Sequence, residues 1–240
     1  MRFLMMRLAF QPFTPMEADM VFHGDKKEGT WLLARAEGHL KDWLVPMVPK
    51  AIETYHLTLT TLLWCALIIL FSFLARYRVQ FLWVVSFSIL GQYITDLLDG
   101  EIGRRRNTGL VKWGYYMDHF LDYLFLCSII IGYGLMVEDA NKYLLFYILA
   151  LFGAFMVNSF LSFAATGAFK IAYMGIGPTE VRAIFVLINT FIVFFAHRFD
   201  IALVLPYVLA GATFALFATV YQTQKQLWKI DMEAKRNAEK

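Results

Sequence analysis

Residues 54–75 read TYHLTLTTLLWCALIILFSFLA and contain no Asp, Glu, Lys or Arg. A helix needs roughly 20 apolar residues to cross the hydrocarbon layer of a bilayer, so this stretch is long enough for one span. Strands of a membrane barrel alternate apolar and polar residues over about ten positions, and this stretch does not. The stretch therefore predicts a transmembrane α-helix.

Five more uncharged stretches follow along the chain. Lipid offers no hydrogen-bond partner to backbone amides, so each span is expected to be helical. The second and third stretches reach about 20 residues only if their charged flanks enter the membrane with them. The six predicted spans are Thr54–Ala75, Val79–Thr95, Tyr123–Val137, Tyr143–Phe169, Ala183–His197 and Ile201–Gln224.

Composition agrees with a lipid environment. Of the 240 residues, 59% are hydrophobic and only 17% are charged, whereas soluble domains average about 25% charged residues. The net charge is only +3, and no run of Lys and Arg with interleaved aromatic residues resembles a nucleic-acid surface. The predicted fold is an all-α polytopic membrane protein with membrane lipids, and no nucleic acid, among its partners.

The chain before the first span has a different pattern. Residues 30–45 carry apolar side chains at helical spacing with charged residues between them, which predicts an amphipathic helix in the membrane interface. A helix packed on a soluble partner is the alternative reading. Arg7 interrupts the apolar residues near the start, and no cleaved signal peptide is expected there. We predict an N-terminal segment at 1–53, a six-helix domain at 54–224 and a tail at 225–240.

The distribution of Lys and Arg predicts the orientation. The break between the second and third spans contains Arg104, Arg105, Arg106 and Lys112, and the tail contains five more basic residues. The breaks on the other side contain only Arg76, Arg78, Lys142 and Arg198. Because basic residues concentrate on the cytoplasmic side, both termini and the arginine-rich break are expected there.

Residues 96–122 read DLLDGEIGRRRNTGLVKWGYYMDHFLD and carry four aspartates. Asp96 and Asp99 are three residues apart, and Asp118 and Asp122 are four apart, so each pair shares one helical face. Two adjacent helices would bring four carboxylates together. Each carboxylate near membrane depth costs about 3 kcal/mol on insertion scales, so cations are expected to compensate them.

The ligand types indicate which cations. Oxygen ligands without a His/Cys cluster favour Mg²⁺ or Mn²⁺ over zinc. Four aspartates could hold two such ions, an arrangement that suits chemistry on a pyrophosphate. Gly100, Gly103 and Gly114 leave room for a ligand near the backbone, and Arg104 lies one turn beyond Gly100, where it could pair with phosphate oxygens. An ion pathway in a transporter also uses buried carboxylates and is the alternative.

The same segment resembles the signature of the CDP-alcohol phosphotransferase, or CDP-alcohol phosphatidyltransferase, family. That signature is Asp, two residues, Asp-Gly, two residues, Ala-Arg, a spacer, then Gly, Asp and Asp at four-residue intervals. Gly103 stands where the family usually has Ala, and the spacer of nine residues, 105–113, is long for the family. The other positions match at Asp96, Asp99, Gly100, Arg104, Gly114, Asp118 and Asp122.

The resemblance implies a membrane enzyme of phospholipid biosynthesis and a homodimer. In this family a CDP-linked alcohol binds beside the metal ions, an acceptor hydroxyl attacks the β-phosphorus, and CMP leaves. By position, Asp96, Asp99 and Asp118 would be metal ligands, with Asp99 touching both ions. Asp122 would be a further ligand or the base that accepts the proton of the acceptor.

Two segments outside the signature also resemble the family. HLTLTTLL at 56–63 is similar to its Pro-Asn-x-Leu-Thr-Leu, which assigns Thr60 to the donor site, although His56 and Leu57 replace Pro-Asn. GPTEVR at 177–182 and the pair Asp118-His119 look like the choline and ethanolamine branch. His119 is therefore a second candidate for the base. A satisfied side chain at the membrane interface is its alternative reading.

Donor and acceptor stay open. One version uses CDP-choline or CDP-ethanolamine and a diradylglycerol-type lipid, and the other uses CDP-diacylglycerol and a small polar alcohol, with or without a phosphate. Lys170, Glu180 and Arg182 are candidates for acceptor binding. Alternatively, Lys170 snorkels at the membrane edge, and Glu180 pairs with Arg182. The alternative outside the enzymes is a transporter or a catalytically silent scaffold.

Overall fold

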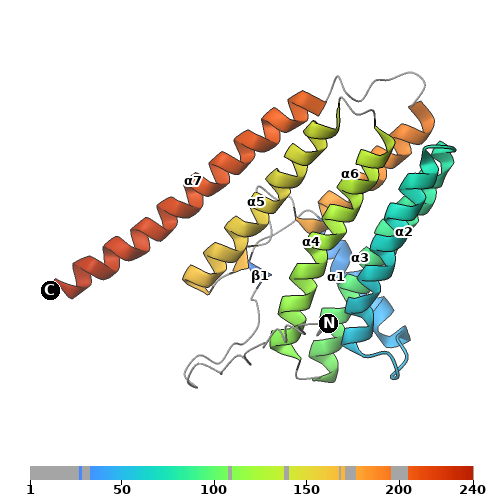
Figure 1. Cartoon of the computed structure of the whole chain (residues 1–240). Coiled ribbons are helices and arrows are strands. Elements are labelled where there is room, and N and C mark those ends of the chain that lie inside the picture. Colours follow the sequence, from blue (N-terminus) through green and yellow to red (C-terminus); the bar gives the residue numbers. More distant parts are fainter. Residues whose placement is uncertain are drawn as a thin grey trace, which may run out of the picture.

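The structure is a computed structural model of the chain, and it describes residues 27–28, 33–107, 110–137, 141–167, 169–170, 177–195 and 205–239. The question of a signal peptide at the N-terminus lies outside these residues. Helices dominate the described part (Figure 1). In order, its elements are β1 (Lys27–Glu28), α1 (Ala34–Leu44), η1 (Val45–Met47), α2 (Thr54–Ala75), η2 (Val79–Phe81), α3 (Leu82–Arg106), α4 (Val111–Met136), α5 (Lys142–Thr166), β2 (Phe169–Lys170), α6 (Pro178–Phe195) and α7 (Leu205–Ala238).

The six-span prediction is confirmed. Six helices, α2 to α7, are long and apolar enough to cross a membrane, with η2 and α3 together forming one 28-residue candidate span. Helix α2 has the predicted bounds, Thr54–Ala75. Helix α3 extends beyond its predicted span to Arg106, and α4 begins before its predicted span, at Val111. The arginines and aspartates of the charged segment are thus part of these helices. The four aspartates therefore lie on helices.

Helix α2 is the centre of the packing. Its contacts with α3 and with α4 are the two most extensive helix–helix contacts in the described structure, and α6 packs on α3. Its buried positions recur every three or four residues and are mostly small or hydroxylated, which lets the neighbouring backbones approach closely. These positions are Thr54, Leu57, Thr58, Thr61, Cys65, Ile68, Ser72 and Ala75.

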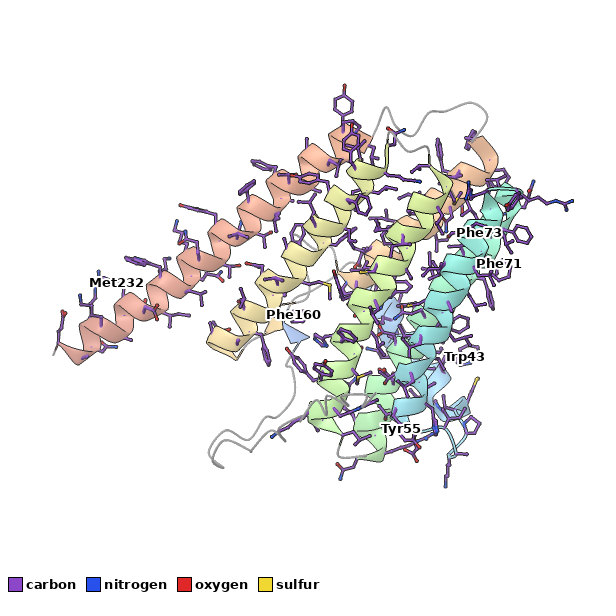
Figure 2. All side chains as sticks on the ribbon, in the orientation of Figure 1. Trp43, Tyr55, Phe71, Phe73, Phe160 and Met232 are labelled. Atoms are coloured by element: carbon purple, nitrogen blue, oxygen red, sulfur yellow. The ribbon has the colours of Figure 1, made fainter. Side chains whose placement is uncertain are left out.

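Large apolar side chains cover the outside of the bundle. Figure 2 shows side chains projecting outward along the helices, and Phe73 on α2 is one of those labelled. Phe73 is 39% exposed, and every candidate span carries exposed large apolar or aromatic residues. Such a surface would be poorly solvated by water but suits contact with lipid chains.

A buried polar network ties three helices together within the membrane region. Asn189 on α6 is 0% exposed; its Oδ1 accepts a hydrogen bond from the hydroxyl of Tyr133 on α4, at 2.8 Å. Its Nδ2 donates to Ser86 Oγ on α3, at 3.1 Å. Polar groups buried among apolar side chains need partners, and this network supplies them while joining α3, α4 and α6.

Helix α7 stands apart from this core. It packs mainly on α5, and its C-terminal end diverges from the other helices in Figure 1. At 1.5 Å per residue its 34 residues span about 51 Å, longer than the hydrocarbon layer of about 30 Å. The helix continues through residues 224 and 225 without a break, and Met232, labelled in Figure 2, lies in its distal part. The division into domain and tail stays a prediction.

Described parts of the chain before α2 contact β2 and the start of α6. Strand β1 pairs in parallel with β2, and Leu33 N donates to Glu180 Oε1 at 3.0 Å. Glu37 of α1 is buried; it pairs with Lys41 at 2.9 Å and accepts from Thr179 Oγ1 at 3.2 Å. Helix α1 lies within residues 30–45, and an amphipathic helix in the membrane interface stays a prediction.

Candidate metal centre

The four aspartates lie at matching depths in α3 and α4. Asp96 and Asp99 precede the last residue of α3, Arg106, by seven to ten residues, and Asp118 and Asp122 follow the first residue of α4, Val111, by about the same number. At 1.5 Å per residue, both pairs lie about 10–16 Å inside their helix ends. Because α2 packs against both helices, it holds them in register for the aspartates to meet.

Three of the four carboxylates gather in one group. Asp96, Asp118 and Asp122 each offer an oxygen, and these oxygens lie within 4.8 Å of one another. Their side chains are only partly exposed, at 21% for Asp96, 26% for Asp118 and 28% for Asp122. Three clustered, partly buried carboxylate oxygens match the ligand preference of Mg²⁺ and Mn²⁺. The group therefore fits a divalent cation.

Asp99 is the most buried of the four aspartates and is not part of that group of three. It is 6% exposed, and its Oδ2 accepts a hydrogen bond from Thr58 Oγ1 on α2 at 2.7 Å. Thr58 is itself only 3% exposed. The fourth predicted ligand is therefore held at the interface between α2 and α3.

A cation of the protein lies among the carboxylates. Arg182 on α6 is 6% exposed, and its Nη2 lies 3.0 Å from Asp96 Oδ2 and 2.9 Å from Asp122 Oδ1. Its Nε donates to Gln92 Oε1 at 2.8 Å, and its guanidinium lies 5.5 Å from the centre of the Phe125 ring. Arg182 thus joins α3, α4 and α6 and partly offsets the negative charge of the cluster.

His119 lies beside the cluster. Its Nδ1 is 3.4 Å from Asp118 Oδ2, and its side chain is 12% exposed. The imidazole packs near the rings of Tyr115, at 4.4 Å between centroids, and Phe160, at 5.6 Å. His119 therefore lies close to one aspartate of the group. This position fits both of its predicted roles, the base and a satisfied side chain.

Comparison with protein-family models matches residues 55–221 to CDP-alcohol phosphatidyltransferase. The chain belongs to the CDP-alcohol phosphatidyltransferase family. No curated protein and no solved structure matches the chain significantly. The CDP-alcohol phosphatidyltransferases are transferases of membrane lipids that use a CDP-alcohol donor, an alcohol acceptor and a divalent metal. The matched range runs from α2 into α7 and contains the whole aspartate cluster. With its six candidate spans, the chain is an integral multi-pass membrane protein.

Other residues of the CDP-alcohol phosphatidyltransferase signature lie near the cluster without joining it. Arg104 is 63% exposed in its side chain and pairs with Glu101 at 2.8 Å. A Cβ added to Gly100 would meet only the guanidinium of Arg104, at 3.6 Å, and one added to Gly114 would meet nothing within 4 Å. Gly103 lies one turn beyond Gly100 on α3. Open space at Gly100 and Gly114 is compatible with a ligand close to the backbone.

The residues predicted from the weaker resemblances are placed differently. Thr60 Oγ1 donates to the carbonyl of Leu57, within its own helix, at 2.5 Å. Glu180 accepts from the backbone of Leu33 and, at 2.9 Å, of Gly177, so it orders the chain before α6 instead of pairing with Arg182. The backbone of Lys170 is in β2, and its side chain lies outside the described residues. Of the two acceptor candidates whose side chains are described, Glu180 and Arg182, Arg182 contacts the aspartates.

Two residues at the site were missed from sequence. Thr58 and Gln92 contact Asp99 and Arg182, and both are buried. The small and hydroxylated residues that recur along α2 were a usable signal for Thr58, because such a stripe marks a face packed against other helices. Gln92, an uncharged polar residue in a span one turn before Asp96, was a weaker one.

Proposed function

We propose that this CDP-alcohol phosphatidyltransferase moves a substituted phosphate from a CDP-alcohol to an acceptor hydroxyl, with release of CMP, in phospholipid biosynthesis. The observation that carries the proposal is the meeting of Asp96, Asp118 and Asp122 from two helices, inside the range that the family matches. A cluster of carboxylates at membrane depth is costly unless it serves a cation.

Each aspartate has a role in the proposal. Asp96, Asp99 and Asp118 would hold two Mg²⁺ or Mn²⁺ ions, and Asp122 would be a further ligand or the base. Bound divalent ions would stabilise negative charge on the attacking and leaving oxygens of a phosphoryl displacement. The acceptor oxygen forms a bond to the β-phosphorus, the bond from that phosphorus to the CMP oxygen breaks, and the acceptor proton passes to Asp122 or His119. Positioning by the chain supplies much of the remaining rate.

We further propose that the site opens on the cytoplasmic side, that residues 54–224 form the catalytic domain and that the enzyme is a homodimer. The orientation rests on the concentration of Arg and Lys in the break between α3 and α4 and in the tail. Gly100, Gly103, Gly114, Arg104 and Thr60 are proposed to line the donor site, where the exposed Arg104 would exchange its partner Glu101 for phosphate.

The two substrate versions differ in what they ask of the cationic residues. A phosphorylated acceptor needs positive partners, and Lys170 and Arg182 are the candidates. The guanidinium of Arg182 is already engaged by Asp96 and Asp122, so its contacts add no separate support to the version with CDP-diacylglycerol. The version with a CDP-choline or CDP-ethanolamine donor and a diradylglycerol acceptor needs no such phosphate site.

Release of CMP from the purified full chain tests the proposal. The protein in detergent or nanodiscs would be given CDP-choline, CDP-ethanolamine or CDP-diacylglycerol, each with its matching acceptors, with and without Mg²⁺ or Mn²⁺. We expect CMP from one donor class, only with both metal and acceptor present. Metal binding without CMP from any donor would support a transporter or a silent scaffold instead.

A further inference from the structure

Thr58 makes a contact that its position in a helix does not require. Its Oγ1 lies 2.7 Å from Asp99 Oδ2 and 3.1 Å from the carbonyl oxygen of Thr54 one turn earlier. Threonines in helices commonly donate to that preceding carbonyl, as Thr190 does to Val186 at 2.8 Å. The additional contact across to α3 is what distinguishes Thr58 from such a threonine.

The hydroxyl of Thr58 has a single hydrogen to give. An ionised carboxylate only accepts hydrogen bonds, so whenever Asp99 is ionised the contact at 2.7 Å requires Thr58 to donate to it. The carbonyl of Thr54 then gives up the hydrogen bond from the Thr58 hydroxyl, but it can still accept a backbone hydrogen bond within α2. With both side chains buried, the bond from Thr58 is shielded from competing water.

We infer that Thr58 is a positioning residue that orients the carboxylate of Asp99 for metal binding. The hydrogen bond from α2 holds Oδ2 and restricts rotation of the Asp99 carboxylate. Groups that hydrogen-bond to metal ligands in this way typically contribute about 10- to 100-fold to metal affinity. The inference rests on the proposed function, since it takes Asp99 to be a metal ligand.

Three variants separate positioning from packing. Thr58→Val keeps the shape and removes the hydroxyl, and Thr58→Ser keeps the hydroxyl. Thr190→Val is the matched control, because it removes a hydroxyl that bonds only to its own helix at a site remote from the aspartates. Mn²⁺ binding to each purified full-length protein would be followed by the electron paramagnetic resonance signal of free Mn²⁺, with no substrate present.

We expect Thr58→Val to weaken Mn²⁺ binding about 10- to 100-fold, with Thr58→Ser and Thr190→Val close to wild type. The metal concentration for half-maximal CMP release should shift by the same factor in Thr58→Val. Wild-type Mn²⁺ affinity in Thr58→Val would overturn the inference, as would equal losses in Thr58→Val and Thr58→Ser. If Thr58→Val fails to fold, Thr58→Ala is judged by the same criteria.

The binding measurement also keeps this inference apart from the proposed function. Mn²⁺ binding that depends on the Thr58 hydroxyl, in a protein that releases no CMP, would uphold the positioning role and defeat the enzyme. CMP release by a protein whose Mn²⁺ binding is unchanged by Thr58→Val would uphold the enzyme and defeat the positioning role. A wild-type protein that binds no Mn²⁺ would overturn both.

Discussion

Arg182 Nη2 lies 3.0 Å from Asp96 Oδ2, which places an arginine of α6 inside the aspartate cluster of α3 and α4. The same nitrogen lies 2.9 Å from Asp122 Oδ1. One guanidinium therefore bridges both helices that carry the signature. Because it is buried and also held by Gln92, it can offset part of the repulsion between the carboxylates whether or not divalent ions are bound.

Arg182→Gln should make folding of the protein depend on divalent ions. Removing one partner of a buried charge pair typically costs about 3–5 kcal/mol, because the remaining charges stay buried without compensation. We expect a lower Tm without metal and a larger rise in Tm on adding Mn²⁺ than in wild type, measured by thermal unfolding in detergent. Arg104→Gln is the control, since its exposed pair is worth at most about 1 kcal/mol. An unchanged Tm without metal would contradict the bridging role.

Asp99→Asn should abolish CMP release while leaving the protein folded. The amide keeps the size of the side chain and can still accept from Thr58, but it removes the negative charge that an ion requires. Turnover at saturating donor and metal is the measurement, with monodispersity and Tm as the check on folding. Asp42→Asn is the control, because Asp42 is 73% exposed and pairs with Arg105 outside the cluster. Activity within a few-fold of wild type would defeat the metal assignment.

His119→Ala should reduce CMP release only modestly. The imidazole lies 3.4 Å from Asp118, so its loss removes a neighbour of one predicted ligand. A general base typically contributes about 10²- to 10⁴-fold, so the size of the loss separates the two roles. A kcat reduced by less than about tenfold fits a supporting residue and leaves Asp122 as the base. Loss of more than 100-fold in a folded protein would instead make His119 the base.

Local sequence signals predicted the helices and the aspartate pairs. They could not predict contacts between residues that are distant in the sequence. The bounds of α2 coincide with an uncharged run because that helix contains no Asp, Glu, Lys or Arg. In α3 and α4 the charges that carry the chemistry lie within the helices, so an uncharged run ends too early. Spacing placed Asp96 and Asp122 on helical faces. It could not show that Arg182, 86 and 60 residues away, would lie between them.

Gly132→Ala should destabilise the protein where Gly134→Ala does not. A Cβ on Gly132 would lie 2.5 Å from Ser72 Oγ and 3.0 Å from Ser72 Cβ, so α2 and α4 would have to separate. Such overpacking costs about 1–3 kcal/mol. A Cβ on Gly134 would meet only Leu145 Cδ1, at 3.9 Å. Tm in detergent is the measurement, and adding Ser72→Gly to Gly132→Ala should restore stability. Equal Tm values for the two alanine variants would contradict the close packing.

Single cysteines should place the arginine-rich break and the tail on the cytoplasmic side. In a background without Cys65 and Cys127, Lys112→Cys and Lys229→Cys should react with a membrane-impermeant maleimide only after cells are opened, whereas Arg76→Cys should react in intact cells. The first reason is the set of basic residues that flank α3, α4 and α7. The second is the length of α7, about 51 Å, which places Lys229 beyond a hydrocarbon layer of about 30 Å. Labelling of Lys112→Cys in intact cells would reverse the orientation and place the aspartate cluster on the outer side.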